Sequence, residues 1–288
     1  MPDKISIVIN LDTRPGFLEA ESDANTSQLG GGTKSLDYFT HGVENKRKFF
    51  EGAGFDVDVT LWIDVHDPLP NALDQQLLAN FAQGKVDSII WHRNDQTFIG
   101  APYFPKWLDL SILTACISAR GKYVAHFDQD MAAFCNDKNV IKEWVGWLDE
   151  GKHHYISYPS AHSPKPINDP RFKSYWWASS RFFMFKREIL DYTEILNCLS
   201  DMEYLYSRYG EEGEPRTPWL EHVLGLIAGS QDKVFYPPPD NRYFVFSWSR
   251  YYSGVLEKLN NMSHDGVIKY ITDCGGIRYP CDLLGNPI

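Results

Sequence analysis

The sequence lacks the marks of secreted, disulfide-rich and membrane-spanning proteins. Its five cysteines are odd in number and form no C-x-x-C pair, which argues against a disulfide scaffold and a zinc cluster. No apolar run approaches the roughly 20 residues that cross a bilayer. The short apolar run within Met1–Leu11 meets Asp12 and has no signal-peptide cleavage site. We therefore expect a cytoplasmic protein with no membrane span.

Basic residues are also scarce. The chain has 28 Lys and Arg against 38 Asp and Glu, a formal net charge of -10. A broad electrostatic attraction to nucleic acid or anionic lipid is therefore not expected. An acidic protein that binds a phosphorylated substrate must offset negative charge locally, and a bound cation does so.

The first 130 residues alternate between short β-branched runs and segments with helical spacing. The expected strands are 5–11, 55–63, 86–91 and 123–127, and the expected helices are 37–52, 71–83 and 108–119. This alternation predicts an α/β fold in which a mostly parallel sheet is sandwiched by helices. Such sheets bind ligands beyond the carboxyl ends of their strands. Polar groups follow the expected strands at Asp12 to Arg14, Asp64, His92 to Asp95 and Asp128 to Asp130.

The rest of the chain gives less regular signals. Helices are expected at 139–148, 186–209 and 218–229, a strand at 154–158 and an extended aromatic segment at 175–185. Residues 240–288 show mixed signals. Because the chain has no internal repeat and no clear linker, we expect one domain spanning 1–288.

An acidic tripeptide, Asp128-Gln129-Asp130, follows the apolar strand 123–127. Side chains two residues apart on a strand point the same way, so the two carboxylates can share a ligand. Hard oxygen ligands suit Mg²⁺ or Mn²⁺, which bind through one or two carboxylates plus substrate phosphates. An isolated D-x-D string is usually a solvated turn. At a strand end of a parallel sheet, it predicts a metal site.

This stretch and its surroundings resemble a GT-A-fold glycosyltransferase of the family-2 type. Residues 119–130 are similar to that family's A-x-G-x-Y strand and D-x-D passage, and the resemblance covers about 1–230 in order. The opening strand 6–9, with Thr13-Arg14-Pro15 after it, resembles the family's first strand and its polar loop. Residues 217–222 are similar to the late acidic motif that holds the catalytic base, although here it contains Glu221-His222 in place of Glu-Asp.

The resemblance implies metal-dependent transfer of a sugar from a nucleotide-diphosphate sugar donor to a saccharide or other hydroxyl acceptor. Residues 1–130 would form the nucleotide-sugar-binding half, and 131–288 the acceptor-side half with a C-terminal tail. Asp130 would be the principal ligand of Mn²⁺ or Mg²⁺, and Asp128 would bind the metal, the ribose or both. Asp12, Arg14 and Asp64 are candidates for contacts to the base and ribose. Each of these three is equally compatible with a solvated loop residue.

The incoming hydroxyl must lose its proton to a carboxylate or imidazole within hydrogen-bond reach. Glu221 is the first candidate for this base and His222 the second, while an acidic residue is also favoured there by the helix dipole alone. Direct attack would invert the anomeric configuration, so we expect an inverting, hexosyltransferase-type enzyme.

Aromatic residues are abundant, with 9 Trp, 16 Tyr and 17 Phe, and they fill cores as well as stack on sugars. Trp176 and Trp177 are candidates for an acceptor-binding floor, and Arg181 for a phosphate contact in the acceptor region. His264 is a candidate third metal ligand, although most isolated histidines bind no metal. Gly30-Gly31-Gly32-Thr33 lacks the ending of a phosphate-binding loop and is expected to be a flexible loop.

Two other functions fit parts of the sequence. A nucleotidyltransferase that forms a nucleotide sugar would need a Gly-rich basic loop directly after the first strand, and Asp12 to Phe17 does not supply one. A sugar- or nucleotide-binding protein with a decayed catalytic site remains compatible with the Glu221-His222 pair.

Overall fold

The computed structural model describes ten ranges of the chain. They are residues 3–12, 41–65, 71–93, 105–129, 131–157, 181–209, 220–228, 233–235, 242–247 and 255–273. A seven-stranded sheet forms the centre, with strand order β3-β2-β1-β4-β7-β6-β8. A separate two-stranded sheet pairs β5 with β9.

The first four strands of the large sheet are parallel. β7 is antiparallel to both β4 and β6, and β8 runs parallel to β6. The strands are β1 Lys4–Asp12, β2 Asp56–Val65, β3 Ser88–Arg93, β4 Tyr123–Asp128, β6 Tyr155–Ser157, β7 Phe182–Lys186 and β8 Val234–Phe235. The predicted α/β class, with a mostly parallel sheet, is confirmed.

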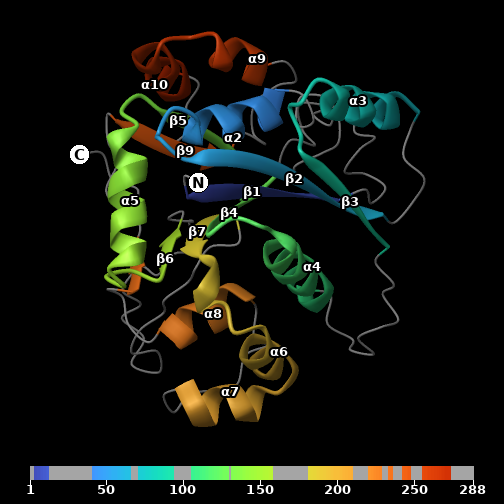
Figure 1. Ribbon diagram of the computed structural model, residues 1–288, viewed down its shortest axis with the longest axis vertical. Helices are drawn as coiled ribbons and strands as arrows, with labels where there is room; N and C mark the ends of the chain where they lie inside the picture. The colour runs from blue at the N-terminus through green and yellow to red at the C-terminus, as the bar shows by residue number, and fades with distance from the viewer. Residues whose placement is uncertain are drawn as a thin grey trace.

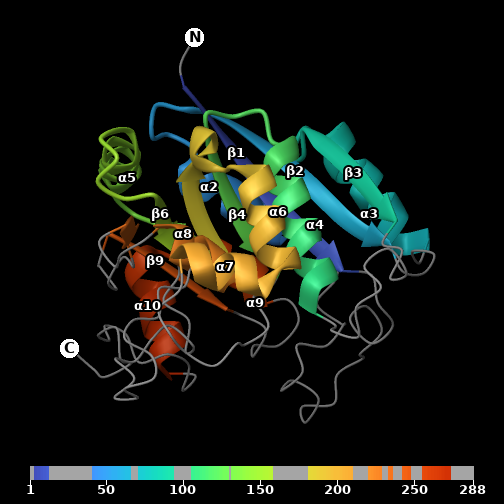
Figure 2. The same ribbon diagram turned by 90° about the horizontal axis from the view of Figure 1, so that it is seen from below.

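Helices cover both faces of this sheet (Figures 1 and 2). On one face lie α2 Val43–Phe50, α3 Asn71–Ala82 and α5 Asn139–Asp149. On the other lie α4 Pro105–Ser118, α6 Tyr192–Ser200, α7 Met202–Tyr209 and α8 Leu220–Ala228. The strands are therefore buried on both sides, which explains why they are nearly continuous apolar runs.

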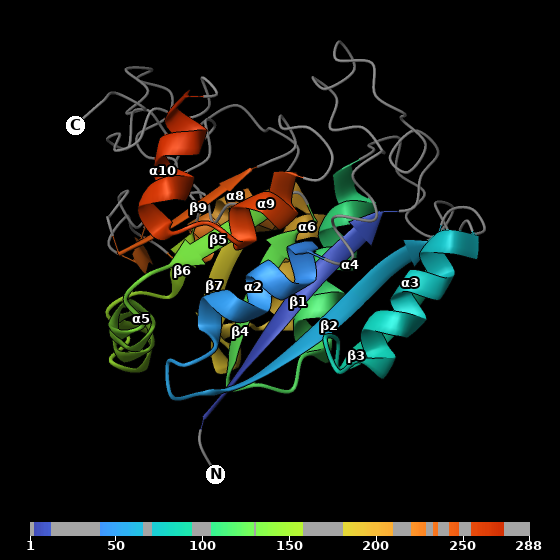
Figure 3. The same ribbon diagram turned by 90° about the horizontal axis from the view of Figure 1, so that it is seen from above.

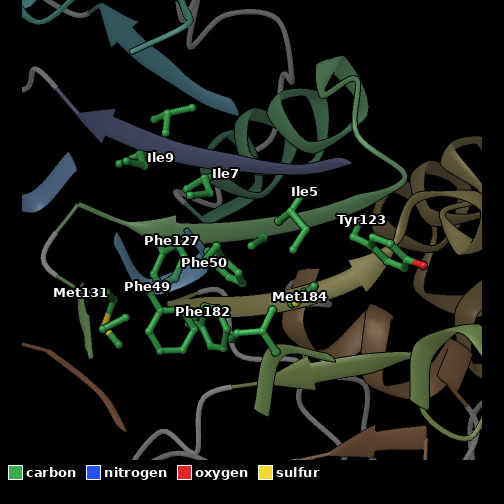
Figure 4. Packing of buried hydrophobic residues seen from close by; sticks show 14 of the residues in the cluster. Ile5, Ile7, Ile9, Phe49, Phe50, Tyr123, Phe127, Met131, Phe182 and Met184 are labelled. Atoms are coloured by element: carbon green, nitrogen blue, oxygen red, sulfur yellow. The ribbon is translucent and has the colours of Figure 1, made fainter. Parts of the chain in front are cut away.

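The strand pleat divides the apolar side chains between two cores. Ile5, Ile7 and Ile9 of β1 pack with Phe49 and Phe50 of α2 (Figure 4), whereas the intervening β1 residues face α4. Each large apolar side chain buried in this way contributes about 1.5–3 kcal/mol to folding. The core on the α2 face contains more aromatic side chains than the other core, and one of them is Phe127 near the end of β4.

The small sheet lies beside α2, and the last two helices pack against it (Figures 1 and 3). These elements are β5 Met131–Cys135, β9 Tyr243–Ser247, α9 Val255–Asn260 and α10 His264–Asp273. Ala132 of β5 packs with Leu256 and Leu259 of α9 and Val267 of α10. Strand β5 begins at Met131, directly after the acidic tripeptide. The C-terminal helices α9 and α10 therefore cover the segment that follows the tripeptide.

The expected helix 186–209 is wrong as one continuous element. A 3-10 turn at Arg187–Ile189 is followed by α6 and α7, which are separated at Asp201. The Asp191 carboxylate caps α6 by accepting from Glu194 N at 2.9 Å, and Asp201 accepts from Tyr204 N at 3.1 Å. Both aspartates satisfy backbone donors at helix starts, which favours two short helices over one long helix.

None of the helices in the described ranges combines the length and apolarity needed to cross a bilayer.

Glu194 joins α6 to α7. Its carboxylate accepts hydrogen bonds from Tyr209 Oη at 2.7 Å and Tyr204 Oη at 2.8 Å, and it pairs with Arg208 Nε at 3.0 Å. These two hydroxyl donors, with a smaller contribution from Arg208, hold the pKa of Glu194 below the ordinary value of 4.5. The charged carboxylate is therefore the form that this contact stabilises.

We expect Glu194→Gln to lower the urea midpoint of unfolding at pH 7. Because the folded pKa is depressed, the contribution of Glu194 is present above the unfolded value. It is lost as the pH falls through the folded value. The difference in midpoint between wild type and variant should therefore shrink below about pH 4.5. A difference that stays constant down to pH 3 would contradict the assignment.

Candidate active site

The strand register brings three of the sequence-predicted residues to one edge of the sheet. Asp12 of β1 lies opposite Asp64 of β2, and Asp64 lies opposite His92 of β3. Asp128 of β4 lies opposite Asn10 of β1, two positions before Asp12. An acidic or imidazole residue thus lies at or one position before the end of each of the four parallel strands, at the end marked by the arrowheads of β1 and β2 in Figure 3.

Asp128 also lies next to Arg181, another predicted site residue. The Asp128 backbone N donates to the Arg181 carbonyl at 2.8 Å, directly beyond the antiparallel pair Phe127 and Phe182. The Arg181 side chain is exposed, and that of Asp128 is half-buried. Two predicted site residues from distant parts of the chain are therefore neighbours at the tip of β4.

A buried polar network lies beneath these strand ends. Asn10 Nδ2 donates to Ser111 Oγ at 3.3 Å, and Asn10 Oδ1 accepts from His126 Nε2 at 3.1 Å. All three side chains are buried, and the His126 ring packs at 5.2 Å from that of Phe183. Hydrogen-bonded buried polar groups fix side-chain orientation. The network ties β1, β4 and α4 together two residues before Asp128.

A lysine from α2 reaches the middle of the acidic tripeptide. Lys46 Nζ donates to the Gln129 carbonyl at 3.3 Å and lies 5.8 Å from the centre of the Phe127 ring. Its side chain is 0% exposed, and none of the other lysines and arginines whose burial is described is as deeply buried. Lys46 was not predictable as a site residue, because the run Glu44 to Lys48 is typical of a solvated helix.

The residue before Lys46 holds the chain after the tripeptide. Asn45 Oδ1 accepts from Ala133 N at 2.7 Å, and Asn45 Nδ2 donates to Asn260 Oδ1 at 2.9 Å. Asn260 Nδ2 in turn donates to the His41 carbonyl at 3.0 Å. Asn45 is buried, so this hub connects α2, β5 and α9 within the protein.

The two base candidates lie at the start of α8. Glu221 is the second residue of the helix and is half-buried, and His222 follows it. Leu220 and Val223 pack in the same core as Val124 of β4. Val124, His126 and Asp128 alternate along β4, so they face the same side of the sheet. Helix α8 therefore begins on the sheet face toward which the Asp128 side chain points.

The remaining predicted metal ligand, His264, is the first residue of α10 and is half-buried. Its helix packs on β5 through Val267 and Ala132, in the layer that follows the tripeptide. Asp130, Arg14, Trp176 and Trp177 fall outside the described residues, and so does the loop at Gly30. Within the described ranges no three His, Cys, Asp or Glu side chains gather as a complete metal site.

The described part of the β4 tip offers one hard oxygen ligand. Asp128 offers a half-buried carboxylate, and oxygen donors of this kind suit Mg²⁺ and Mn²⁺. Thiolate ligands are not offered by the described cysteines, Cys116, Cys135 and Cys198, which are free thiols. Burial raises the pKa of Cys135 and of Cys198 to about 11, so both are protonated at neutral pH.

No family model matches the chain, and no curated protein matches it in sequence. Three similar solved structures are TarS of S. aureus, mouse xyloside xylosyltransferase 1 in its apo form, and TarS 1-349. Their sequence identities are 11%, 10% and 11% over 94%, 82% and 94% of this chain, with TM-scores of 0.42, 0.42 and 0.40. This chain spans 42%, 85% and 70% of their lengths. Likenesses this distant do not assign an activity.

Proposed function

We propose that the protein is a metal-dependent glycosyltransferase that moves a sugar from a nucleotide-sugar donor to an acceptor hydroxyl. One observation carries this proposal. Asp12, Asp64 and Asp128 lie at or one position before the ends of three adjacent parallel strands, with Asp12 opposite Asp64 and Asp128 opposite Asn10, at the end where such sheets bind ligands. Aspartates at these positions in an acidic protein are suited to a cation and to ribose hydroxyls, and Arg181, directly before the adjacent strand β7, is the neighbour of Asp128.

Each residue has a defined role in this proposal. Asp130 and Asp128 would hold Mn²⁺ or Mg²⁺, with His264 as a further ligand. The bound cation would stabilise the charge that develops on the leaving diphosphate. Asp12, Arg14 and Asp64 would bind the base and ribose and so orient the anomeric carbon. Trp176, Trp177 and Arg181 would line the acceptor side.

Glu221 is the proposed base, with His222 as the alternative. A carboxylate at the start of α8 is on the sheet face of Asp128, where it can accept the proton of the incoming hydroxyl. Attack assisted in this way displaces the diphosphate from the opposite side of the ring, which inverts the configuration. The anomer of the product, measured by proton NMR, tests this point.

The function itself is tested by a thermal-shift screen of nucleoside diphosphates and nucleotide sugars, with and without Mn²⁺. A ligand that binds only the folded state raises the melting temperature. At a concentration of 100 Kd it adds about 2.7 kcal/mol to the free energy of unfolding. We expect at least one nucleoside diphosphate to raise the melting temperature only when Mn²⁺ is present. Equal melting temperatures for every nucleotide, with metal and without, would contradict the proposal.

Turnover separates a transferase from a protein whose site has decayed. We expect slow hydrolysis of the matching nucleotide sugar in Mn²⁺, measured as release of nucleoside diphosphate. Binding without any release would favour the decayed sugar- or nucleotide-binding protein. Release of pyrophosphate from a nucleoside triphosphate and a sugar phosphate would favour the nucleotidyltransferase.

A further inference from the structure

Lys46 combines complete burial with a contact to the acidic tripeptide. Removing an ammonium group from water costs several kcal/mol unless nearby groups compensate. Two compensating contacts lie on either side of Asp128, namely the Phe127 ring and the Gln129 carbonyl. A buried positive charge is therefore fixed behind the peptide that connects the two aspartates.

Hydrogen bonds to neighbouring residues of α2 fix the position of the Lys46 ammonium. Asn45 binds Ala133 N through its side chain, so consecutive residues of α2 hold the backbone at 129 and at 133. The end of α2 is fixed in turn by Lys138, whose Nζ donates to the Phe49 carbonyl at 2.9 Å and also to the Lys48 carbonyl. Helix α2 thus presents Lys46 to the tripeptide from a rigid support.

We propose that Lys46 is a positioning residue of the donor site. Its ammonium orients the Gln129 peptide, so that the flanking aspartates are presented to the cation, and adds positive charge behind the bound diphosphate. This inference rests on the proposed transferase function and extends it, because it makes binding of the second phosphate depend on a protein charge as well as on the metal. A lysine with only a structural role would not distinguish a diphosphate from a monophosphate.

The experiment measures dissociation constants by calorimetry with saturating Mn²⁺. The ligands are the nucleoside diphosphate selected by the thermal-shift screen and the corresponding monophosphate. The variants are Lys46→Met, which removes donor and charge, Lys46→Gln, which retains a donor without charge, and Lys46→Arg, which retains both. Lys138→Met is the matched control, since it removes a lysine that supports the same helix but does not contact the tripeptide.

We expect Lys46→Met and Lys46→Gln to weaken diphosphate binding about 10-fold, as is typical when groups that orient metal ligands are replaced. Monophosphate binding should change much less, and Lys46→Arg and Lys138→Met should bind both ligands as wild type does. If Lys46→Met does not fold, Lys46→Gln supplies the same comparison. If neither variant folds, Lys46 acts in folding and the inference is overturned.

Binding measurements on the folded variants could overturn the inference in three ways. Wild-type affinity in Lys46→Met or Lys46→Gln would show that the charge is not used. Equal weakening of diphosphate and monophosphate, or equal weakening by Lys138→Met, would show that α2 has a general structural role. After any of these three results the transferase proposal stands, because wild type still binds the diphosphate with Mn²⁺. Absence of binding in wild type itself would overturn both proposals.

Discussion

Asp128→Asn should lower kcat by about 100-fold or more, with little change in the melting temperature. A single group that stabilises developing charge in a transition state contributes about this much. Asparagine has nearly the same shape but no charge, so it weakens the hold on the cation. The strand itself should persist, because Asp128 takes part in the sheet through its backbone N and its side chain is only half-buried.

The measurement is the initial rate of nucleoside diphosphate release at several Mn²⁺ concentrations. Asp56→Asn serves as the control, because Asp56 is an exposed aspartate at the start of β2, at the end of the sheet away from the candidate site. The control should have the kcat of wild type. Unchanged activity in Asp128→Asn would remove the tip of β4 from the mechanism, whatever the fate of the other assignments.

Gly121→Ala should destabilise the protein by about 1–3 kcal/mol, the usual cost of overpacking. A Cβ at Gly121 would lie 2.7 Å from Ser6 N and 2.8 Å from the Lys4 carbonyl oxygen. These are backbone atoms of the central strand, which cannot move aside without shifting β1. The Gly121 N also donates to Ser6 Oγ at 2.7 Å. The glycine is therefore needed for the close approach of the loop before β4 to β1.

Gly146→Ala is the matched substitution for this test. Gly146 lies inside α5, and a Cβ there would meet no atom within 4 Å. Alanine favours a helix over glycine by up to about 1 kcal/mol, so this variant should melt above wild type. Gly121→Ala should melt lower, by about 2–4 °C for each kcal/mol lost. If both variants shifted in the same direction, the steric explanation for Gly121 would be wrong.

The parallel half of the fold was predictable because its signals are local. β1 and β4 appear where apolar β-branched runs occur, and α3 and α5 lie within a few residues of the predicted positions. The ends of β2 and β3 were less accurate. Both strands continue two residues further than expected, so Asp64 and His92 are the last or nearly last strand residues rather than loop residues. Both residues still lie near the carboxyl ends of adjacent parallel strands, because the direction and order of the strands fix that position.

The contacts around the candidate site were not predictable, because their partners are remote in the sequence. Lys46 and Gln129 are 83 residues apart, and Asn10 and His126 are 116 apart. Nothing in a helical Asn-Lys pair distinguishes buried from solvated side chains until the tertiary contacts are known. His126 carried a weak signal, as an imidazole inside an apolar strand. The short strand β5 was also missed, because it forms only by pairing with β9.

The hydrogen bond between Asn45 and Asn260 spans 215 residues, and this separation affects biosynthesis. A nascent chain can pair β1 with β2 and pack α2 while it is still attached to the ribosome. The Asn45 carboxamide cannot bond to Asn260 until α9 has been synthesised, which happens much later. The contacts that join α2, β5 and α9 around Asn45 should therefore become complete only after α9 has been synthesised.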